Sequence, residues 1–298
     1  MHVTVLTTWV RRQPAAARRR QRHVGPAGDP YSRYCHGMGR VRAVLLDIDG
    51  VLTVSWQPVP GAVAALEWLR AAGVPLALVT NTTSRTRQSM ASALRAAGFP
   101  VTAEVIVTAP TVAAAYLQDH YPGARCLLLN SGDIGADLTG ITLADDDSAG
   151  VDVVVIGGAG PEFSYSAINR AFRCLQDGAR LVAMSRALYW RTSDGLQLDS
   201  GAFVAGLEQA AHMQAEVVGK PAAAFFEFAV GGLGVPSGAA LMVGDDVDND
   251  VIAAQRCGLT GVLARTGKYN ARALAAAPAE PDHVIDSIAD LPALLGRA

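Results

Sequence analysis

The sequence has few cysteines, few histidines and no long apolar run, and each scarcity excludes a class of protein. Its four cysteines are scattered without a CxxC pair, which argues against a disulfide framework or a zinc site and is typical of a reducing cytoplasm. The six histidines show no metal-ligand spacing. No apolar stretch reaches the roughly 18 residues that a membrane span needs. We therefore expect a cytoplasmic protein that has no membrane partner.

Charge is divided unequally along the chain. Residues 1–40 hold eight arginines and one acidic residue, Asp29, whereas the remainder holds 17 basic and 26 acidic side chains, so a segment of +7 precedes a body of −9. The segment lacks hydrophobic periodicity and is rich in Arg, Pro and Gly, which predicts a disordered extension. We interpret it as a dispensable leader, with Met38 as a candidate true start. The body has no broad basic patch, which argues against a nucleic-acid partner.

From residue 41 onward, short apolar runs alternate with helical patterns. The run "VRAVLLDI" predicts a buried strand, and "PGAVAALEWLRAAG" predicts a helix that stops near Gly73. A second strand, "VPLALVT", precedes "SRTRQSMASALRAAG", which predicts a helix with Ser84 as its N-cap. The same alternation returns near the end of the chain, with a second α/β set between. This alternation is the signature of βαβ units, so we predict an α/β protein with a doubly wound, Rossmann-like parallel sheet.

Polar residues follow several predicted strands. The stretch "AVLLDIDGVLTV" places Asp47 and Asp49 two residues apart, so both project to one side of the first strand's end. In a parallel sheet, ligands bind beyond the carboxyl ends of the strands. Other predicted strands are followed by Thr80 and Asn81, by Lys220, and by an acidic loop that contains Asp245, Asp246, Asp248 and Asp250. Any one such residue is typical of a turn, but together they predict a shared site.

The chemistry of this residue set favours phosphoryl transfer. Several carboxylates in one pocket repel one another unless a cation joins them. Because no histidine or cysteine is close in sequence, a hard cation such as Mg²⁺ fits best. A cation, a lysine and a helix N-terminus together form a pocket for a phosphoryl group. In this interpretation Asp47 attacks phosphorus, and Asp49 protonates the leaving oxygen and later activates water.

The same residues resemble four motifs of the haloacid dehalogenase (HAD) superfamily, in that family's order. "LLDIDGVLT" is similar to motif I, "VTNTTS" to motif II, "VVGKP" to motif III and "MVGDDVDNDV" to motif IV. The resemblance implies a nucleophile, an acid/base, a Mg²⁺ site and a phosphate site. It implies that Asp47 is the nucleophile and Asp49 the acid/base. It implies that the metal is held by Asp47, Asp49 (through its backbone carbonyl), Asp245 and Asp250. It implies that the phosphate is bound by Thr80, Asn81 and Lys220. Whether Asp246 or Asp248 also contacts the metal stays open.

Residues 109–200, between motifs II and III, resemble the inserted α/β cap of the NagD-type branch (class IIA). The expected division is therefore an extension at 1–40, a core at 41–108 and 201–298, and a cap at 109–200. Within this branch, "FSYSAINRAFRCLQDGA" and "VLARTGKYN" look most like the phospholysine phosphohistidine inorganic pyrophosphate phosphatase subgroup. Some of its members lack the second aspartate of motif I. This chain keeps Asp49, which favours hydrolysis, because the leaving group otherwise departs without a proton donor.

The sequence thus predicts a Mg²⁺-dependent phosphatase whose partner is a small phosphorylated molecule. Gly158, Arg186 and Tyr189 are candidate cap residues that face the substrate, although Tyr189 is equally suited to packing inside the cap. Whether the substrate is a phosphate ester, a phosphoamidate or pyrophosphate is left open. A homodimer through the cap is one option for assembly. The alternatives are a non-catalytic phosphate-binding regulatory protein, and a phosphotransferase or dehalogenase on the same fold.

Overall fold

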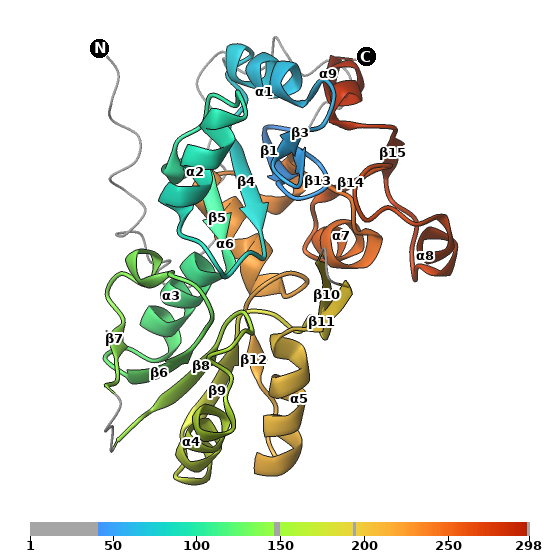
Figure 1. Ribbon diagram of the computed structural model, residues 1–298. Helices are drawn as coiled ribbons and strands as arrows, with labels where there is room; N and C mark the ends of the chain where they lie inside the picture. The colour runs from blue at the N-terminus through green and yellow to red at the C-terminus, as the bar shows by residue number, and fades with distance from the viewer. Residues whose placement is uncertain (1–40, 146–149, 193–194, 297–298) are drawn as a thin grey trace, which may run out of the picture.

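The computed structural model describes residues 41–145, 150–192 and 195–296, so the extension predicted at residues 1–40 lies outside the described residues. Two parallel sheets, one of six strands and one of five, occupy the upper and lower parts of the molecule in Figure 1. Two short antiparallel ribbons accompany them. We call the part built on the six-stranded sheet the core and the part built on the five-stranded sheet the cap.

The core sheet is doubly wound, as predicted. Its strand order is β15-β14-β13-β1-β4-β5, and every neighbouring pair is parallel. The chain builds outward from β1 first through β4 and β5, and later through β13 on its other side, so the direction of winding reverses at β1. Ligands of such sheets bind at this reversal point. The strands are β1 (Ala43–Asp47), β4 (Leu76–Thr80), β5 (Ile106–Thr108), β13 (Ala240–Gly244), β14 (Thr260–Ala264) and β15 (His283–Ile285).

Helices cover both faces of the core sheet because successive strand residues point to opposite sides. Val44 and Leu46 face one apolar cluster, and Leu45 between them faces another. The first cluster includes residues of α1 (Ala62–Ala71), α2 (Arg87–Ala96) and α9 (Leu291–Gly296). The second includes residues of α3 (Ala109–His120), α6 (Ala223–Leu233) and α7 (Ala253–Arg256). A further helix, α8 (Ala271–Ala276), packs on a small cluster around Leu263.

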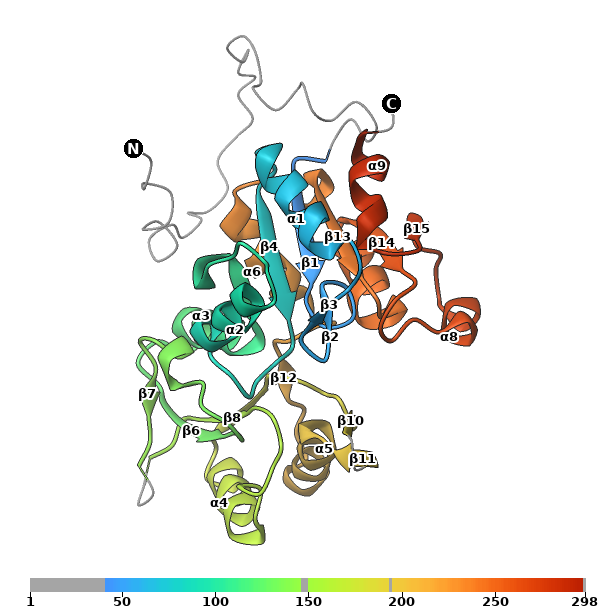
Figure 2. The same ribbon diagram turned by 45° about the horizontal axis from the view of Figure 1, so that its top comes forward.

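The cap sheet has the order β12-β9-β8-β6-β7, again with parallel neighbours. One face packs against α4 (Tyr165–Gln176) and α5 (Ser200–Ala211), and the opposite face shares a cluster with α3. Figure 2 shows α4 and α5 on the side away from the core. The strands are β6 (Arg125–Leu129), β7 (Thr142–Leu143), β8 (Val153–Ile156), β9 (Arg180–Ala183) and β12 (Glu216–Val217). Because β12 lies past residue 200, the cap sheet draws its edge strand from beyond the expected cap segment.

Shorter elements complete the described chain. The ribbons are β2 (Thr53–Val54) with β3 (Gln57–Pro58), and β10 (Tyr189–Thr192) with β11 (Gly195–Leu198). Five short turns of 3-10 or π type are η2 (Ala103–Val105), η3 (Gly135–Asp137), η4 (Ser237–Ala239), η5 (Val247–Ile252) and η6 (Ile288–Asp290). None of the helices in the described ranges is long and apolar enough to cross a bilayer.

One predicted helix boundary is wrong. The N-cap of α2 is Thr86, whose hydroxyl accepts a hydrogen bond from Ser89 N at 3.2 Å, and not Ser84. The reason is a tertiary contact. The Ser84 backbone lies against Gly132 of the cap, and the N–H of Arg87, which begins the helix, donates to the Asp137 carboxylate at 2.7 Å. The loop after β4 is therefore two residues longer than the sequence pattern predicts.

Candidate functional site

Three buried carboxylates meet at the carboxyl edge of the core sheet. Asp47 ends β1, Asp245 directly follows the neighbouring strand β13, and Asp250 lies on the turn η5. Their exposed fractions are 4%, 1% and 2%. One carboxylate oxygen from each lies within 4.8 Å of the others, which is a spacing that a metal ion can bridge. Strand register therefore joins residues that are about 200 positions apart in the sequence.

Lys220 neutralises part of this charge. Its Nζ lies 2.7 Å from Asp47 Oδ1 and 2.7 Å from Asp250 Oδ1, and its side chain is 5% exposed. Its backbone is held by the side chain of Asn81: Asn81 Nδ2 donates to Lys220 O at 2.8 Å, and Lys220 N donates to Asn81 Oδ1 at 2.8 Å. The amide of Asn81, predicted to bind phosphate, is thus engaged in placing the lysine.

Asp245 is fixed through one oxygen while the other has no partner. Its Oδ2 accepts a hydrogen bond from Lys268 N at 2.6 Å, and its buried Oδ1 makes no hydrogen bond. Two glycines surround the carboxylate. A Cβ on Gly50 would lie 1.8 Å from Asp245 Oδ2, and a Cβ on Gly267 would lie 2.0 Å from it. Both glycines also have positive φ, +98° and +55°, so any other residue is excluded by both space and backbone conformation.

Burial dominates the ionisation of this group. It raises the pKa of Asp47 well above its ordinary value, although the Lys220 ammonium acts in the opposite direction. It also raises the pKa of Asp245 to about 6, against the hydrogen bond from Lys268 N that lowers it. For Lys220, burial disfavours the charged form, but the Asp250 and Asp47 carboxylates outweigh it and raise the pKa. Three carboxylates and one lysine sum to −2, which a divalent cation would balance. The unpaired Asp245 Oδ1 is a ready ligand atom for it.

Asp49 is separate from this cluster and exposed. Its Oδ2 accepts from Thr80 Oγ1 at 3.4 Å and from Thr82 Oγ1 at 3.5 Å, and these two hydroxyls lie 3.0 Å apart. Its carboxylate is not among the three that could share a metal ion. This position, in contact with solvent and next to the buried cluster, is suited to proton exchange.

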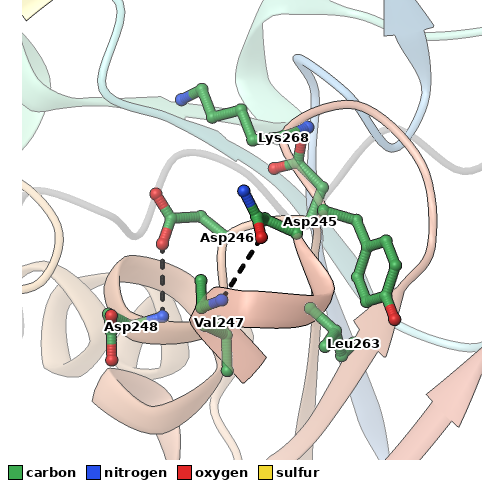
Figure 3. Close-up of a pocket in the computed structure, with 9 residues that line it drawn as sticks. Asp245, Asp246, Val247, Asp248, Leu263 and Lys268 are labelled. Atoms are coloured by element: carbon green, nitrogen blue, oxygen red, sulfur yellow. Dashed lines mark hydrogen bonds between the residues drawn. The ribbon is translucent and has the colours of Figure 1, made fainter. Parts of the chain in front are cut away.

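The acidic loop after β13 divides into different roles. The Asp246 carboxylate caps η5 by accepting from Asp248 N at 3.2 Å and Asn249 N at 3.0 Å, and Figure 3 shows Asp246 turned toward Asp248. Asp248 is exposed. Both line a pocket of about 250 Å³ next to Asp245. The carboxylate of Asp246 is therefore engaged in the turn that orients Asp250.

The three cap candidates occupy different places. Gly158 reaches the core: a Cβ there would lie 2.4 Å from Thr83 Oγ1. Arg186 forms an ion pair with the buried Glu208 within the cap. Tyr189 lies on β10 and is 61% exposed, so it does not pack inside the cap. Of the three, Gly158 is the one that the structure brings against the loop after β4.

Sequence reasoning missed several residues of this arrangement. Gly267 and the N–H of Lys268 come from "RTGK" after β14, and Gly50 directly follows the second aspartate of "DIDG". Thr82 was also overlooked, although it directly follows Asn81. A glycine at the end of a strand was an available signal, but which carboxylate it would approach depends on the sheet order.

Two family profiles match the chain. That of the haloacid dehalogenase-like hydrolases matches residues 44–143, and a second, HAD-hydrolase-like, matches residues 217–291. The unmatched segment between them contains β8, β9 and the β10–β11 ribbon. The matched segments carry all the predicted core site residues.

Curated relatives and a solved structure are similar over most of the chain. Human haloacid dehalogenase-like hydrolase domain-containing protein 2 is 40% identical over 231 residues, which are 78% of this chain and 86% of that protein. The phospholysine phosphohistidine inorganic pyrophosphate phosphatase of Xenopus laevis is 39% identical over 236 residues, which are 77% of this chain and 85% of that protein. The structure of NagD from Escherichia coli K-12 aligns with a TM-score of 0.76 at 27% identity, covering 84% of this chain and 98% of NagD.

Proposed function

Because this chain belongs to the haloacid dehalogenase-like hydrolases, we propose that it is a Mg²⁺-dependent phosphatase that hydrolyses a small phosphorylated molecule through a phosphoaspartate at Asp47. Family membership makes the chain a hydrolase of the phosphatase type. The metal, the intermediate and the residue roles are the proposal. The observation that carries them is the buried group of Asp47, Asp245 and Asp250 with Lys220 between two of them.

The residues fit a divalent cation. Asp47, Asp245 and Asp250 offer oxygen ligands, and the unpaired, buried Asp245 Oδ1 lacks any other partner. The described histidines are absent from this group, which favours Mg²⁺ over softer metals. When bound, the cation supplies positive charge beside the transferring phosphoryl group. In its absence Lys220 is the sole cation in contact with Asp47 among the described residues.

In the first step, a carboxylate oxygen of Asp47 attacks phosphorus in line with the leaving atom. The bond from phosphorus to the leaving atom breaks, and the leaving atom keeps the electron pair and takes a proton from Asp49. The Lys220 ammonium stabilises the phosphoryl oxygens, and the hydroxyl of Thr80 would do so by turning its one O–H from Asp49 to the bound phosphoryl group. Asp49 is placed for this proton transfer by the hydroxyls of Thr80 and Thr82.

In the second step, water attacks the phosphoaspartate. Asp49, now ionised, takes a proton from this water, and the bond between phosphorus and the Asp47 oxygen breaks. The electron pair returns to the Asp47 carboxylate, and inorganic phosphate leaves. The chain's own residues thus return to their starting protonation states.

The substrate class is proposed from the relatives. The Xenopus relative is named for phospholysine, phosphohistidine and pyrophosphate, so we propose that this chain acts on small phosphoamidates, phosphate esters or pyrophosphate. The cap, taken as residues 109–200 with the core on either side, would contact the leaving group. We also propose a cytoplasmic protein that assembles as a homodimer through the cap, where Leu188, Tyr189, Trp190, Leu196 and Leu198 are exposed.

The test uses the full chain with lysine phosphoamidate, histidine phosphoamidate, pyrophosphate and p-nitrophenyl phosphate. We expect phosphate release with Mg²⁺ that stops with EDTA, and no release by Asp47→Asn. The matched control is Asp177→Asn, because Asp177 is exposed at the end of α4. Rapid acid quenching should trap one labelled phosphoryl group per wild-type chain and none on the Asp47 variant. Full activity of Asp47→Asn would overturn the proposed nucleophile.

A further inference from the structure

The loop after β4 is tied to the cap by the side-chain amide of Asn130. This residue follows β6, and its Nδ2 donates to Thr83 O at 3.1 Å. Its Oδ1 accepts from Gly158 N at 2.8 Å, at the turn that follows β8. One amide therefore joins two cap strands to a core loop whose first residues, Thr80 and Asn81, belong to the proposed phosphate site.

Glycines allow the two parts to touch. A Cβ on Gly158 would lie 2.4 Å from Thr83 Oγ1, and a Cβ on Gly132 would lie 2.4 Å from Ser84 O. At both positions any larger residue would push the cap away from the loop. We call this contact, made by Asn130, Gly132 and Gly158 on the cap with Thr83 and Ser84 on the core, the cap–loop seam.

A second link continues the seam away from the site. The buried carboxylate of Asp137, on η3, accepts from Arg87 N at 2.7 Å and from Arg87 Nε at 3.1 Å. Asn130, Gly132 and Asp137 after β6 thus contact Thr83, Ser84 and Arg87 after β4 in the same order. The cap is held along a line, and the Asn130 end of that line is the end nearest to Thr80 and Asn81.

We propose that Asn130 is a positioning residue that sets the place of the cap over the phosphate site and so selects substrates by their leaving group. The proposal rests on the proposed phosphatase function. The core residues hold the phosphoryl group, which every substrate shares, whereas the leaving group extends toward the cap. A displacement of about 1 Å between groups that act together can lower a rate roughly 100-fold, so loss of the seam acts most strongly on substrates with large leaving groups.

Asparagine is specifically suited to this position. Its amide offers a donor to Thr83 O and an acceptor to Gly158 N at the same time. Aspartate would keep the acceptor for Gly158 N but would place a negative oxygen against the Thr83 carbonyl. Alanine would remove both bonds, and also the bonds that Asn130 Nδ2 donates to Ser131 O and Gly132 O within the cap, each at 3.0 Å. Asn130→Asp therefore removes the bonds donated by Nδ2, including the link to Thr83 O, but keeps the bond to Gly158 N, whereas Asn130→Ala removes both kinds.

The experiment compares two substrates of the full chain, p-nitrophenyl phosphate with an aromatic leaving group and acetyl phosphate with a small one. We expect Asn130→Asp and Asn130→Ala to lower kcat/KM for p-nitrophenyl phosphate about tenfold more than for acetyl phosphate. This ratio does not depend on the fraction of folded enzyme. Ser164→Ala is the matched control, because it removes the N-cap of α4 in the cap without touching the seam, and should leave the ratio unchanged.

Hydrogen exchange gives a second readout that needs no activity. Both Asn130 variants should speed exchange in residues 81–87, and Asn130→Ala should also speed it in residues 157–160, whereas Ser164→Ala should speed it in α4. An unchanged substrate ratio in both Asn130 variants would overturn the positioning role, and unchanged exchange would overturn the seam itself. A wild-type chain that releases phosphate from neither of these substrates, nor from the phosphoamidates and pyrophosphate of the first test, refutes the proposed function instead, and exchange then decides the seam alone.

Discussion

Replacing Lys220 by methionine tests the electrostatics of the buried cluster. Methionine keeps much of the length and apolar volume of lysine but removes the ammonium that lies 2.7 Å from both Asp47 Oδ1 and Asp250 Oδ1. At an effective dielectric constant of about 20, each such pair contributes roughly 6 kcal/mol of attraction. The desolvation of three buried charges offsets much of this gain.

Lys220→Met should therefore lower the free energy of unfolding by about 3–5 kcal/mol, which is the cost of removing one partner from a buried ion pair. For a chain of this size it corresponds to a fall of roughly 6–10 °C in Tm. Because a divalent cation would balance the same carboxylates, the loss should shrink when Mg²⁺ is added. Activity should fall by roughly 100- to 1,000-fold, since a donor to the phosphoryl oxygens is lost.

Thermal unfolding followed by circular dichroism, in EDTA and in excess Mg²⁺, measures this effect. The chain offers a matched control, because its second lysine, Lys268, is exposed and its hydrogen bond to Asp245 comes from the backbone N–H, which methionine keeps. Lys268→Met should shift Tm by little more than 1 °C. A Lys220→Met shift in EDTA as small as that of the control would refute the reasoning.

Three further predictions follow from the same contacts. Burial raises the pKa of Asp245 to about 6. The stabilisation that this shift gives is complete below the pKa of the unfolded chain and is lost as pH rises through 6. In EDTA, Asp245→Asn should therefore unfold at a higher Tm than wild type at pH 7.5, and the difference in Tm should close toward pH 4. Burial, together with hydrogen bonds to Glu216, raises the pKa values of Tyr116 and Tyr121 to about 12, so the stability that they add is present below pH 10 and lost toward pH 12; absorbance at 295 nm should show their late ionisation, and Glu216→Gln should advance it. Asn81→Ala removes both bonds to the Lys220 backbone and should lower the free energy of unfolding by about 1–3 kcal/mol, measured by denaturant titration. In steady-state kinetics its effect on kcat should be larger than its effect on KM. An unchanged kcat would contradict the role of Asn81 in placing the lysine.

Local pattern was sufficient for the fold class. Apolar runs of four or five residues followed by helical periodicity predict parallel strands with helices between them, and the two parallel sheets confirm this. The similarity to haloacid dehalogenase-like hydrolases confirms the family resemblance carried by the four motifs. Pattern failed at the start of α2, because a cap contact against Ser84 overrides the local capping preference there.

The candidate site depended on more than pattern. Asp47, Thr80 and Asp245 each end or follow a strand that local pattern predicts. The rule that ligands bind at the carboxyl ends of parallel strands was therefore sufficient to predict them as neighbours. It could not show that the Asn81 amide, predicted to bind phosphate, also bonds the Lys220 backbone, because that contact joins two distant strand ends. Nor could it find Asn130 and Thr82, whose residue types are common in turns and whose partners come from other elements.

The sequence by itself determined which residue types follow each strand, and hence a phosphoryl-transfer site rich in carboxylates, because short-range periodicity and strand ends are encoded in neighbouring residues. Only the tertiary structure decided which oxygen of Asp245 is free, which carboxylates share Lys220, and how Asn130 joins the cap to the core. The partners in these contacts lie between 23 and 173 residues apart in the sequence. Their geometry depends on sheet order and on close approaches at Gly50, Gly158 and Gly267, which no local pattern specifies.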